Sequence, residues 1–496
     1  MSFKQTLLQN SHRKRWKISL QPMPAWIAIL GLFFVILVGL LVGAAPILSL
    51  VFPLSSFIVG VFLYRKYPIL YVGFTWWLWF LAPLIKRLID YRSGYGTFGN
   101  LTLSAMLVTS ISFGALWKNL PKYLANSSNQ DGLPFILCAG SIVYAFIIGL
   151  IRQSTTIDLR SILLPLMSWL APIAFGFYLF INWRNYPSYR QNTQRVFFWA
   201  VVVMGVYGIL QFFLVPPWEK FHIATFGEDF SLGWYGEAEP MKLRVWSTME
   251  TPFDFSQIWV SGLILLLVNR SNTCFIIAGL GYLVLLLTRV RSSWYIWFVS
   301  FLFFTSFVKP EKQIRTVVGL AALLIIIVPL ILTTSFSSDL VDRFESLLNI
   351  QNDVSFQGRF NGTADLMSFA LTNFFGVGLL QTSGVSIDGS YLNNNLIFHV
   401  VDNGYITLFL SLGWFGIVPY LSGISIIFFK LFQSFAGRFD IFFTAVRAIA
   451  IGSFLGILTT NISYGAGAMN IWGFLGIAMA ARKYHYYQHS NQQNRF

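Results

Sequence analysis

The stretch Ala25–Gly43, which reads AWIAILGLFFVILVGLLVG, decides the fold. It contains no charged residue, and as a helix rising about 1.5 Å per residue it can cross a hydrocarbon layer of roughly 30 Å. Similar apolar runs recur as far as Met479, and 56% of the 496 residues are hydrophobic while 11% are charged. A single soluble core stops growing at roughly 250–300 residues. The sequence therefore predicts an all-α polytopic membrane protein.

The apolar runs divide into about 14 predicted transmembrane helices. The first two are nearly continuous around Pro46, and the eighth is short. The predicted spans are 25–43, 45–64, 67–85, 100–117, 133–151, 161–182, 196–214, 257–269, 273–288, 293–308, 316–334, 403–429, 440–459 and 465–481.

Lysine and arginine indicate how the chain is threaded through the membrane. The basic stretch Arg13–Lys17 precedes the first span, which is too long for the apolar region of a cleaved signal peptide. With the N-terminus in the cytoplasm, the cytoplasmic segments hold 21 of the 34 lysines and arginines. This bias follows the positive-inside rule, so we expect both termini to be cytoplasmic.

The threading predicts seven consecutive regions. Two long external loops stand out, and their tryptophan and phenylalanine content is typical of folded caps rather than of disordered spacers. The regions are a basic cytoplasmic N-terminus (1–24), N-terminal transmembrane helices (25–215), a first periplasmic loop (216–257), central transmembrane helices (258–334), a second periplasmic loop (335–401), C-terminal transmembrane helices (402–481) and a cytoplasmic tail (482–496).

The net charge of +15 does not indicate nucleic-acid binding. The positive residues are scattered through short loops rather than gathered on one face, and topology accounts for them. The only cysteines, Cys138 and Cys274, fall within predicted spans. The sequence therefore indicates neither a disulfide framework nor a cysteine-based metal site.

Three arginines fall at the ends of apolar spans on the predicted external side, which is otherwise poor in positive charge. They are Arg244, Arg291 and Arg359, and Arg289 competes with Arg291 for the second place. Each one alone is more simply explained by a side chain that reaches from a helix end to the membrane surface. Together on one side they indicate a site for phosphate or another anion.

The strongest local pattern is Asp402-Asn403, followed by nine residues and then Gly413-x-x-Gly416. It opens the span after the second loop, so Asp402 is predicted at the outer edge of the membrane. A helix cap at Asp402 or Asn403 and close helix packing at the glycines would also explain the pattern.

Four motifs in this order resemble the O-antigen and exopolysaccharide polymerase and O-antigen ligase superfamily of bacterial inner-membrane proteins. Besides Asp402-Asn403, they are Arg244-Val245-Trp246-Ser247-Thr248, Thr288-Arg289-Val290-Arg291-Ser292-Ser293-Trp294, and Gly358-Arg359 with the segment ending at Gly376-Val377-Gly378. The resemblance covers roughly residues 240–430.

The resemblance implies a membrane glycosyltransferase with a GT-C-like bundle that acts at the periplasmic face of the bacterial inner (plasma) membrane. It implies an undecaprenyl-pyrophosphate-linked oligosaccharide as donor, an acceptor glycan, and neither metal nor other cofactor. Arg244, Arg291 and Arg359, with Arg289 as the competitor, would hold the pyrophosphate. Membrane lipids and a chain-length regulator would be further partners.

One position departs from the ligase branch, in which a histidine followed by Asn is the proposed base. This chain has Asp402 there, and His399 lies three residues earlier. The departure favours a polymerase, with Asp402 as general base and inversion at the anomeric carbon. His399, Glu250 and Asp254 are reserve candidates, and Glu250 could instead orient Arg244. Asn403, Tyr405, Gly358, Gly413 and Gly416 are the expected supporting residues.

Two alternatives stay open. An O-antigen ligase would transfer the glycan to a different acceptor by the same chemistry. An anion transporter could use the same arginines, although the sequence shows no inverted repeat with paired interrupted helices.

Overall fold

The computed structural model describes residues 22–94, 103–125, 131–152, 159–225, 233–268, 272–308, 367–379, 403–434 and 440–493, with a few isolated positions between 313 and 325. Over these residues, seven helices are long and apolar enough to cross a membrane, and three shorter helices are also apolar. The chain is thus an all-α polytopic membrane protein, as predicted. The number of about 14 spans remains a prediction.

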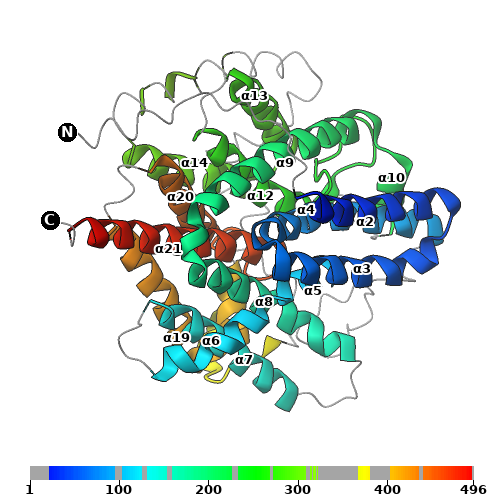
Figure 1. Ribbon diagram of the computed structural model, residues 1–496. Helices are drawn as coiled ribbons and strands as arrows, with labels where there is room; N and C mark the ends of the chain where they lie inside the picture. The colour runs from blue at the N-terminus through cyan, green and yellow to red at the C-terminus, as the bar shows by residue number, and fades with distance from the viewer. Residues whose placement is uncertain are drawn as a thin grey trace.

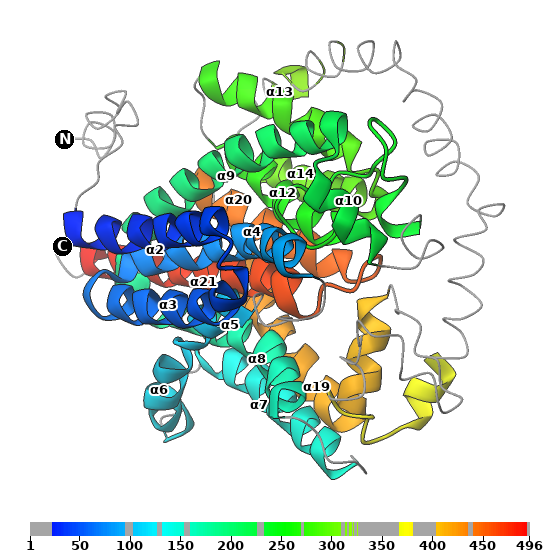
Figure 2. The ribbon, with the colours of Figure 1, turned by 90° about the vertical axis from the view of Figure 1, so that its right-hand side faces the viewer.

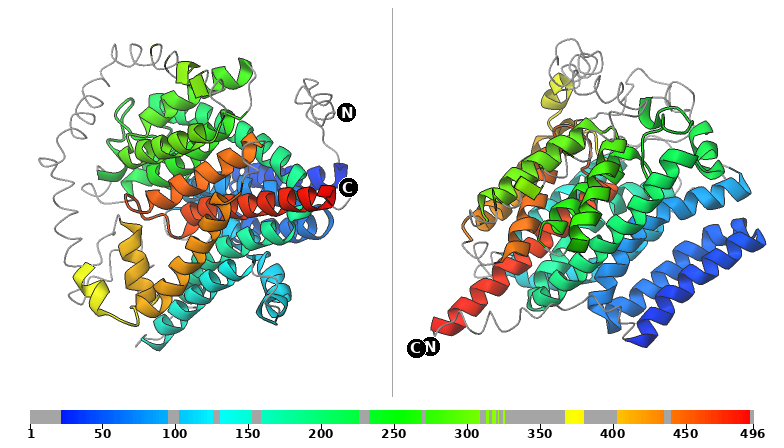
Figure 3. Two further views of the ribbon diagram at one scale, coloured as in Figure 1. Left: turned by 90° about the vertical axis from the view of Figure 1, so that its left-hand side faces the viewer. Right: turned by 90° about the horizontal axis from the view of Figure 1, so that it is seen from above.

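The first helices form a hairpin at the edge of the bundle. Helix α2 (Met23–Val42) ends at Gly43, whose left-handed φ of 80° lets the chain reverse into α3 (Ala45–Lys66). Figure 3 shows the two lying side by side at the periphery. Many of their large apolar side chains are exposed, as expected for a surface that faces lipid.

The next helices differ from the predicted spans mainly at their ends. Helix α4 (Pro68–Ser93) runs eight residues past the predicted end at 85, so it carries Lys86 and Arg87 within the helix. The predicted span 100–117 is wrong as one helix, because α5 (Leu103–Ser110) and α6 (Phe113–Ala125) are separated by a turn at 111–112. Helices α7 (Leu133–Ile151) and α8 (Leu159–Ile181) follow.

The central part of the chain builds a second group of helices (Figure 1). A short 3-10 turn (Trp183–Asn185) leads into α9, which starts ten residues before the predicted span. The group comprises α9 (Tyr186–Leu214), α10 (Pro217–Ala224), α12 (Pro252–Leu266), α13 (Asn272–Leu287) and α14 (Arg291–Ser306).

Helix α21 (Gly465–Gln493) packs closely against α8 near the middle of the molecule. A methyl group on Gly476 would approach the Cα of Gly176 to 2.6 Å, so the two backbones cross with no room for a side chain. Small residues at such crossings are how helices pack tightly in membranes, where no hydrophobic drive brings them together.

Helix α19 (Gly404–Phe432) lies beside α7 on the opposite side of the molecule from α13 (Figure 2). Arg447 of α20 (Ile441–Gly456) donates to the Leu431 carbonyl at 3.0 Å near the C-terminal end of α19, and its guanidinium lies over the Phe443 ring. The cation thus meets orphan carbonyls and the negative end of the helix dipole. This contact accounts for an arginine within the predicted span 440–459.

Candidate functional site

Most of the predicted site residues that the structure describes lie at one end of the bundle, called here the loop end, whereas Gly413 and Gly416 lie farther along α19. It consists of the C-terminal part of α4, the described segments 215–225 and 233–251, the junction 287–291 between α13 and α14, the start of α19, and the turn 457–464. Backbone hydrogen bonds link some of these parts in pairs. The Val245 amide donates to Leu287 at 3.1 Å, and the Gly404 amide at the start of α19 donates to Ile457 at 2.8 Å.

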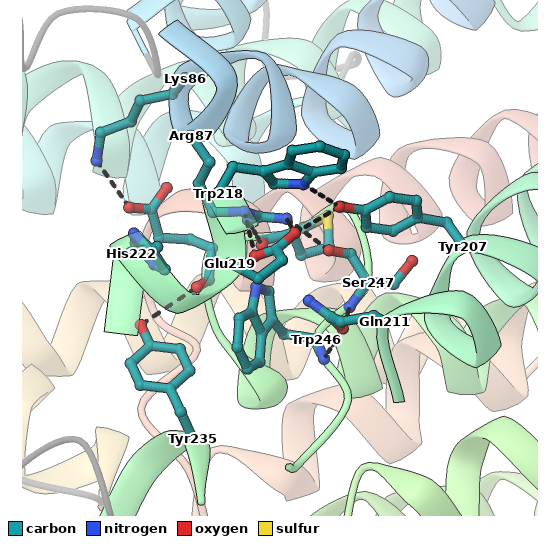
Figure 4. A network of polar contacts seen from close by, with 12 residues as sticks. Lys86, Arg87, Tyr207, Gln211, Trp218, Glu219, His222, Tyr235, Trp246 and Ser247 are labelled. Carbon is teal, nitrogen blue, oxygen red and sulfur yellow. Dashed lines mark hydrogen bonds and ion pairs between the residues drawn. The ribbon is translucent and has the colours of Figure 1, made fainter. Parts of the chain in front are cut away.

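The centre of the loop end is a fully buried ion pair between Arg87 of α4 and Glu219 of α10 (Figure 4). Arg87 Nε lies 2.9 Å from Glu219 Oε2, and both side chains have no exposed surface. The Arg87 guanidinium also donates to the Ser247 carbonyl at 2.6 Å and to the Met249 carbonyl. A buried charge is tolerated when it is paired and hydrogen-bonded, and Arg87 has both a counter-charge and hydrogen bonds to two carbonyls.

Two aromatic side chains extend this network toward α9. The Tyr207 hydroxyl donates to Glu219 Oε1 at 2.5 Å, and the Trp218 indole donates to the Tyr207 oxygen at 2.7 Å. The Glu219 carboxylate therefore receives hydrogen bonds from both α4 and α9. Glu219 thus joins the transmembrane helices α4 and α9 to the short helix α10.

Gln211 of α9 holds the backbone that follows Arg244. Its side-chain oxygen accepts hydrogen bonds from the amides of Trp246 at 3.1 Å and Ser247 at 2.8 Å. Ser247 has a left-handed φ of 50°, a conformation that costs energy for a residue other than glycine. The motif Arg244–Thr248 is therefore fixed by buried contacts rather than left as a mobile loop.

Glu250 pairs with Lys86, a partner that the sequence did not predict. Lys86 Nζ lies 2.8 Å from Glu250 Oε1, and the Glu250 side chain is 29% exposed. Burial alone would raise the pKa of the Glu250 carboxyl, but the charges of Lys86 and Arg87 and a hydrogen bond from Lys86 lower it. Glu250 is thus an ionised, partly exposed carboxylate beside the buried ion pair.

The two competing arginines have different surroundings. Arg289 is largely buried, and its guanidinium donates to the carbonyls of Met241 at 3.1 Å and Lys242 at 3.2 Å. Its left-handed φ of 54° turns the chain between α13 and α14. Arg291 is the first residue of α14 and is partly exposed. Arg289 therefore anchors the backbone at residues 241–242. Arg291 is the more accessible of the two arginines.

Arg244 lies in the same folded segment. Its amide donates to the Tyr235 carbonyl at 2.8 Å, next to a bridge between Gly236 and Leu243. The side chain is partly exposed, like that of Arg291.

The start of α19 also belongs to the loop end. The Asn403 side chain caps the helix by accepting a hydrogen bond from the Tyr405 amide at 3.0 Å, so the capping alternative holds for this residue. The Tyr405 hydroxyl donates to the Phe454 carbonyl at 3.1 Å. Asp402, His399, Arg359 and Gly358 lie outside the described residues.

Sequence reasoning missed most of the buried network. Lys86, Arg87, Tyr207, Gln211, Glu219 and His222 were not singled out as site residues, although Glu219 lies in the first loop. The available signal was the adjacent pair Lys86-Arg87 at the predicted end of a span that faces the acid-rich loop 216–257. Within the described parts of the chain, no three His, Cys, Asp or Glu side chains form a cluster that could hold a metal ion.

His222 makes the stability of the loop end depend on pH. Burial and the positive charges of Arg87 and Lys86 lower its pKa to about 3, whereas the nearby Glu250 acts in the opposite direction. The unfolded chain therefore binds a proton near pH 6.5 that the folded chain does not bind. Stability that is present above pH 6.5 is lost as the pH falls toward 3.

We expect the wild type to lose up to about 2 kcal/mol between pH 6.5 and pH 5, since one pKa unit corresponds to ~1.4 kcal/mol. Thermal unfolding in detergent at several pH values measures this loss. His222→Gln should flatten the pH dependence over this range. A variant with the wild-type slope would show that another group is responsible.

Comparison with known families matches a segment of the chain that begins in α13. Residues 274–421 match the family model described as O-antigen ligase. The matched segment contains Arg289, Arg291, Asp402 and Asn403. The match confirms the resemblance to the O-antigen polymerase and ligase superfamily, and it supports ligase- or polymerase-like function in general. No curated protein matches the chain.

Proposed function

We propose that this protein is a GT-C-type glycosyltransferase that polymerises undecaprenyl-pyrophosphate-linked oligosaccharide repeat units into O-antigen or exopolysaccharide at the periplasmic face. The observation that carries the proposal is the family match over 274–421. It covers the helix that begins with Arg291 and the start of α19. The folded segment 233–251 contacts the same matched region, because the Val245 amide donates to the Leu287 carbonyl, four residues before Arg291.

The charges at the loop end suit a donor with a pyrophosphate leaving group. Negative charge grows on this group as its bond to the anomeric carbon breaks, and fixed guanidinium groups stabilise it. Arginine suits the task because its planar fork meets phosphate oxygens in pairs. Arg244 and Arg291, both partly exposed, are the described candidates, and Arg359 is proposed as the third.

Asp402 is the proposed general base. Its carboxylate would take the proton of an acceptor hydroxyl as the oxygen forms a bond to the anomeric carbon and the lipid pyrophosphate leaves, with inversion at that carbon. Positioning and charge stabilisation by arginines would make the reaction independent of a metal ion. Glu250 suits a positioning role better than the role of base, because its carboxylate is paired with Lys86 and its lowered pKa makes it a weaker proton acceptor.

A ligase is the second candidate, because the matching family model is described as O-antigen ligase. The two reactions share donor, base and leaving group and differ only in the acceptor. Asp402 in place of the ligase-type histidine favours the polymerase.

The test is turnover by the purified full-length protein in nanodiscs with EDTA, supplied with lipid-linked oligosaccharide from the native host. We expect glycans on the lipid to lengthen with the wild type. Asp402→Asn should lower the rate roughly 100-fold or more, since a positioned base contributes about 10²–10⁴. Asp388→Asn, which changes another acid of the predicted second loop, is the matched control.

Three outcomes would contradict the proposal. Normal turnover by a folded Asp402→Asn variant would remove Asp402 as the base. Donor consumption only after a non-lipid acceptor is added would establish the ligase. No consumption under either condition would remove the enzyme and direct the work to anion flux.

A further inference from the structure

Helix α19 is broken at Gly413, nine residues after its first residue. Gly413 has φ 58° and ψ −174°, which lies in a region of backbone conformation that is open essentially only to glycine. The break divides the helix into an outer half, residues 404–412, and an inner half, residues 414–432. A break inside a transmembrane helix exposes amide and carbonyl groups that water cannot reach, so the protein must satisfy them.

Residues 374–378, called here the strap, supply those partners. The Val377 amide donates to the Leu410 carbonyl at 2.7 Å, and the Trp414 amide donates to the Phe374 carbonyl at 2.8 Å. In an unbroken helix, Leu410 and Trp414 would bond to each other. The Gly378 amide likewise donates to Ser411 at 3.2 Å. The strap thus takes the hydrogen-bonding groups that the break releases.

Glycines make this close approach possible. A methyl group on Gly376 would lie 2.6 Å from the Gly413 amide nitrogen, and one on Gly413 would lie 2.6 Å from the Phe374 carbonyl oxygen. On its other side the strap meets α7, where a methyl group on Gly378 would lie 3.0 Å from the Ala145 carbonyl. Figure 2 shows the segment 367–379, which contains the strap, beside α19.

The outer half of α19 is also held at its first turn. The Gly404 amide donates to Ile457 at 2.8 Å, and the Asn461 side chain donates to the Thr407 hydroxyl at 3.0 Å. A methyl group on Gly404 would lie 2.7 Å from Ile457, so this contact is also tight. The short half-helix is therefore fixed at both ends by non-helical segments, and its start at Asn403 cannot shift independently of the strap.

From this arrangement we infer that the strap and the break at Gly413 position the start of α19 for catalysis. Gly376 and Gly413 are thus positioning residues for the proposed base Asp402, which directly precedes Asn403 in the chain. The inference rests on the proposed function and adds to it a role for residues 374–378 of the predicted second loop. The inference also gives different roles to the two glycines of Gly413-x-x-Gly416, since Gly416 packs against Tyr144 of α7.

The experiment compares Gly413→Ala and Gly376→Ala with Gly423→Ala. Gly423 is a crowded glycine of the same helix, where a methyl group would lie 2.6 Å from the Pro134 carbonyl, but it does not touch the strap. Two quantities are measured on folded protein in nanodiscs: kcat with its KM for lipid-linked oligosaccharide, and hydrogen–deuterium exchange of the amides in 374–378 and 404–412.

For Gly413→Ala and Gly376→Ala we expect kcat to fall at least ten-fold with KM changed less than two-fold, and exchange to rise together in both segments. Gly423→Ala should lower thermal stability while kcat per folded molecule stays within two-fold of the wild type. If exchange rises in both segments but kcat is unchanged, or if Gly423→Ala lowers kcat equally, the positioning role is wrong. If exchange rises in only one segment, the strap does not hold the half-helix. Absence of turnover by the wild type would instead contradict the proposed function, and the exchange result would stand by itself.

Discussion

Arg291→Ala is expected to lower turnover roughly 100- to 1,000-fold, because removal of one donor that stabilises developing negative charge costs about 2.7–4 kcal/mol in the transition state. Arg291 begins α14, so the positive end of the helix dipole adds to the guanidinium charge. Arg291→Lys should recover only part of the rate, since an ammonium group cannot meet two phosphate oxygens in a planar fork. Steady-state rates with lipid-linked oligosaccharide measure the effect.

Arg289→Ala is the matched control for this prediction. The Arg289 guanidinium donates to the backbone carbonyls of Met241 and Lys242. Loss of these hydrogen bonds should therefore reduce thermal stability more than turnover per folded molecule. If folded Arg289→Ala loses turnover while Arg291→Ala retains it, the assignment of the two arginines is reversed.

Glu219→Gln is expected to destabilise the protein by about 3–5 kcal/mol, because it leaves the Arg87 charge buried without its counter-charge. The loss should appear as a marked fall in thermal stability in detergent. Tyr207→Phe removes only one hydrogen bond to the same carboxylate and should cost about 1 kcal/mol.

The double variant Arg87→Met with Glu219→Gln tests the reason for this loss. Removal of both charges should restore part of the stability, since the buried cation is gone. If Glu219→Gln costs no more than Tyr207→Phe, the ion pair contributes little and the other contacts hold the segment.

Hydrophobic runs alone predict the membrane class, because each span must hide its backbone within one apolar helix. They predict the positions of α2 and α3 closely. They fail where polar residues continue a helix beyond the lipid. Helix α4 continues through Lys86 and Arg87 because both side chains find acidic partners far along the chain.

The candidate site is likewise predictable from the sequence only in part. Motif order predicts Arg291 and the start of α19 as site residues, because those residues stand in local patterns. Glu219 and Arg87 are 132 residues apart, and no local pattern links them. The broken helix was likewise outside the reach of sequence reasoning. The pattern Gly413-x-x-Gly416 is compatible with ordinary close packing, and only the backbone angles reveal the strap.

The strap has a consequence for how the chain enters the membrane during synthesis. Residues 374–378 precede α19, so the segment that satisfies the broken helix is made before the helix that depends on it. The outer half of α19 cannot partition alone into lipid without exposing the Leu410 and Ser411 carbonyls, which the strap otherwise occupies. We therefore expect this helix to leave the translocon together with the preceding segment, as a single insertion unit rather than as an independent span.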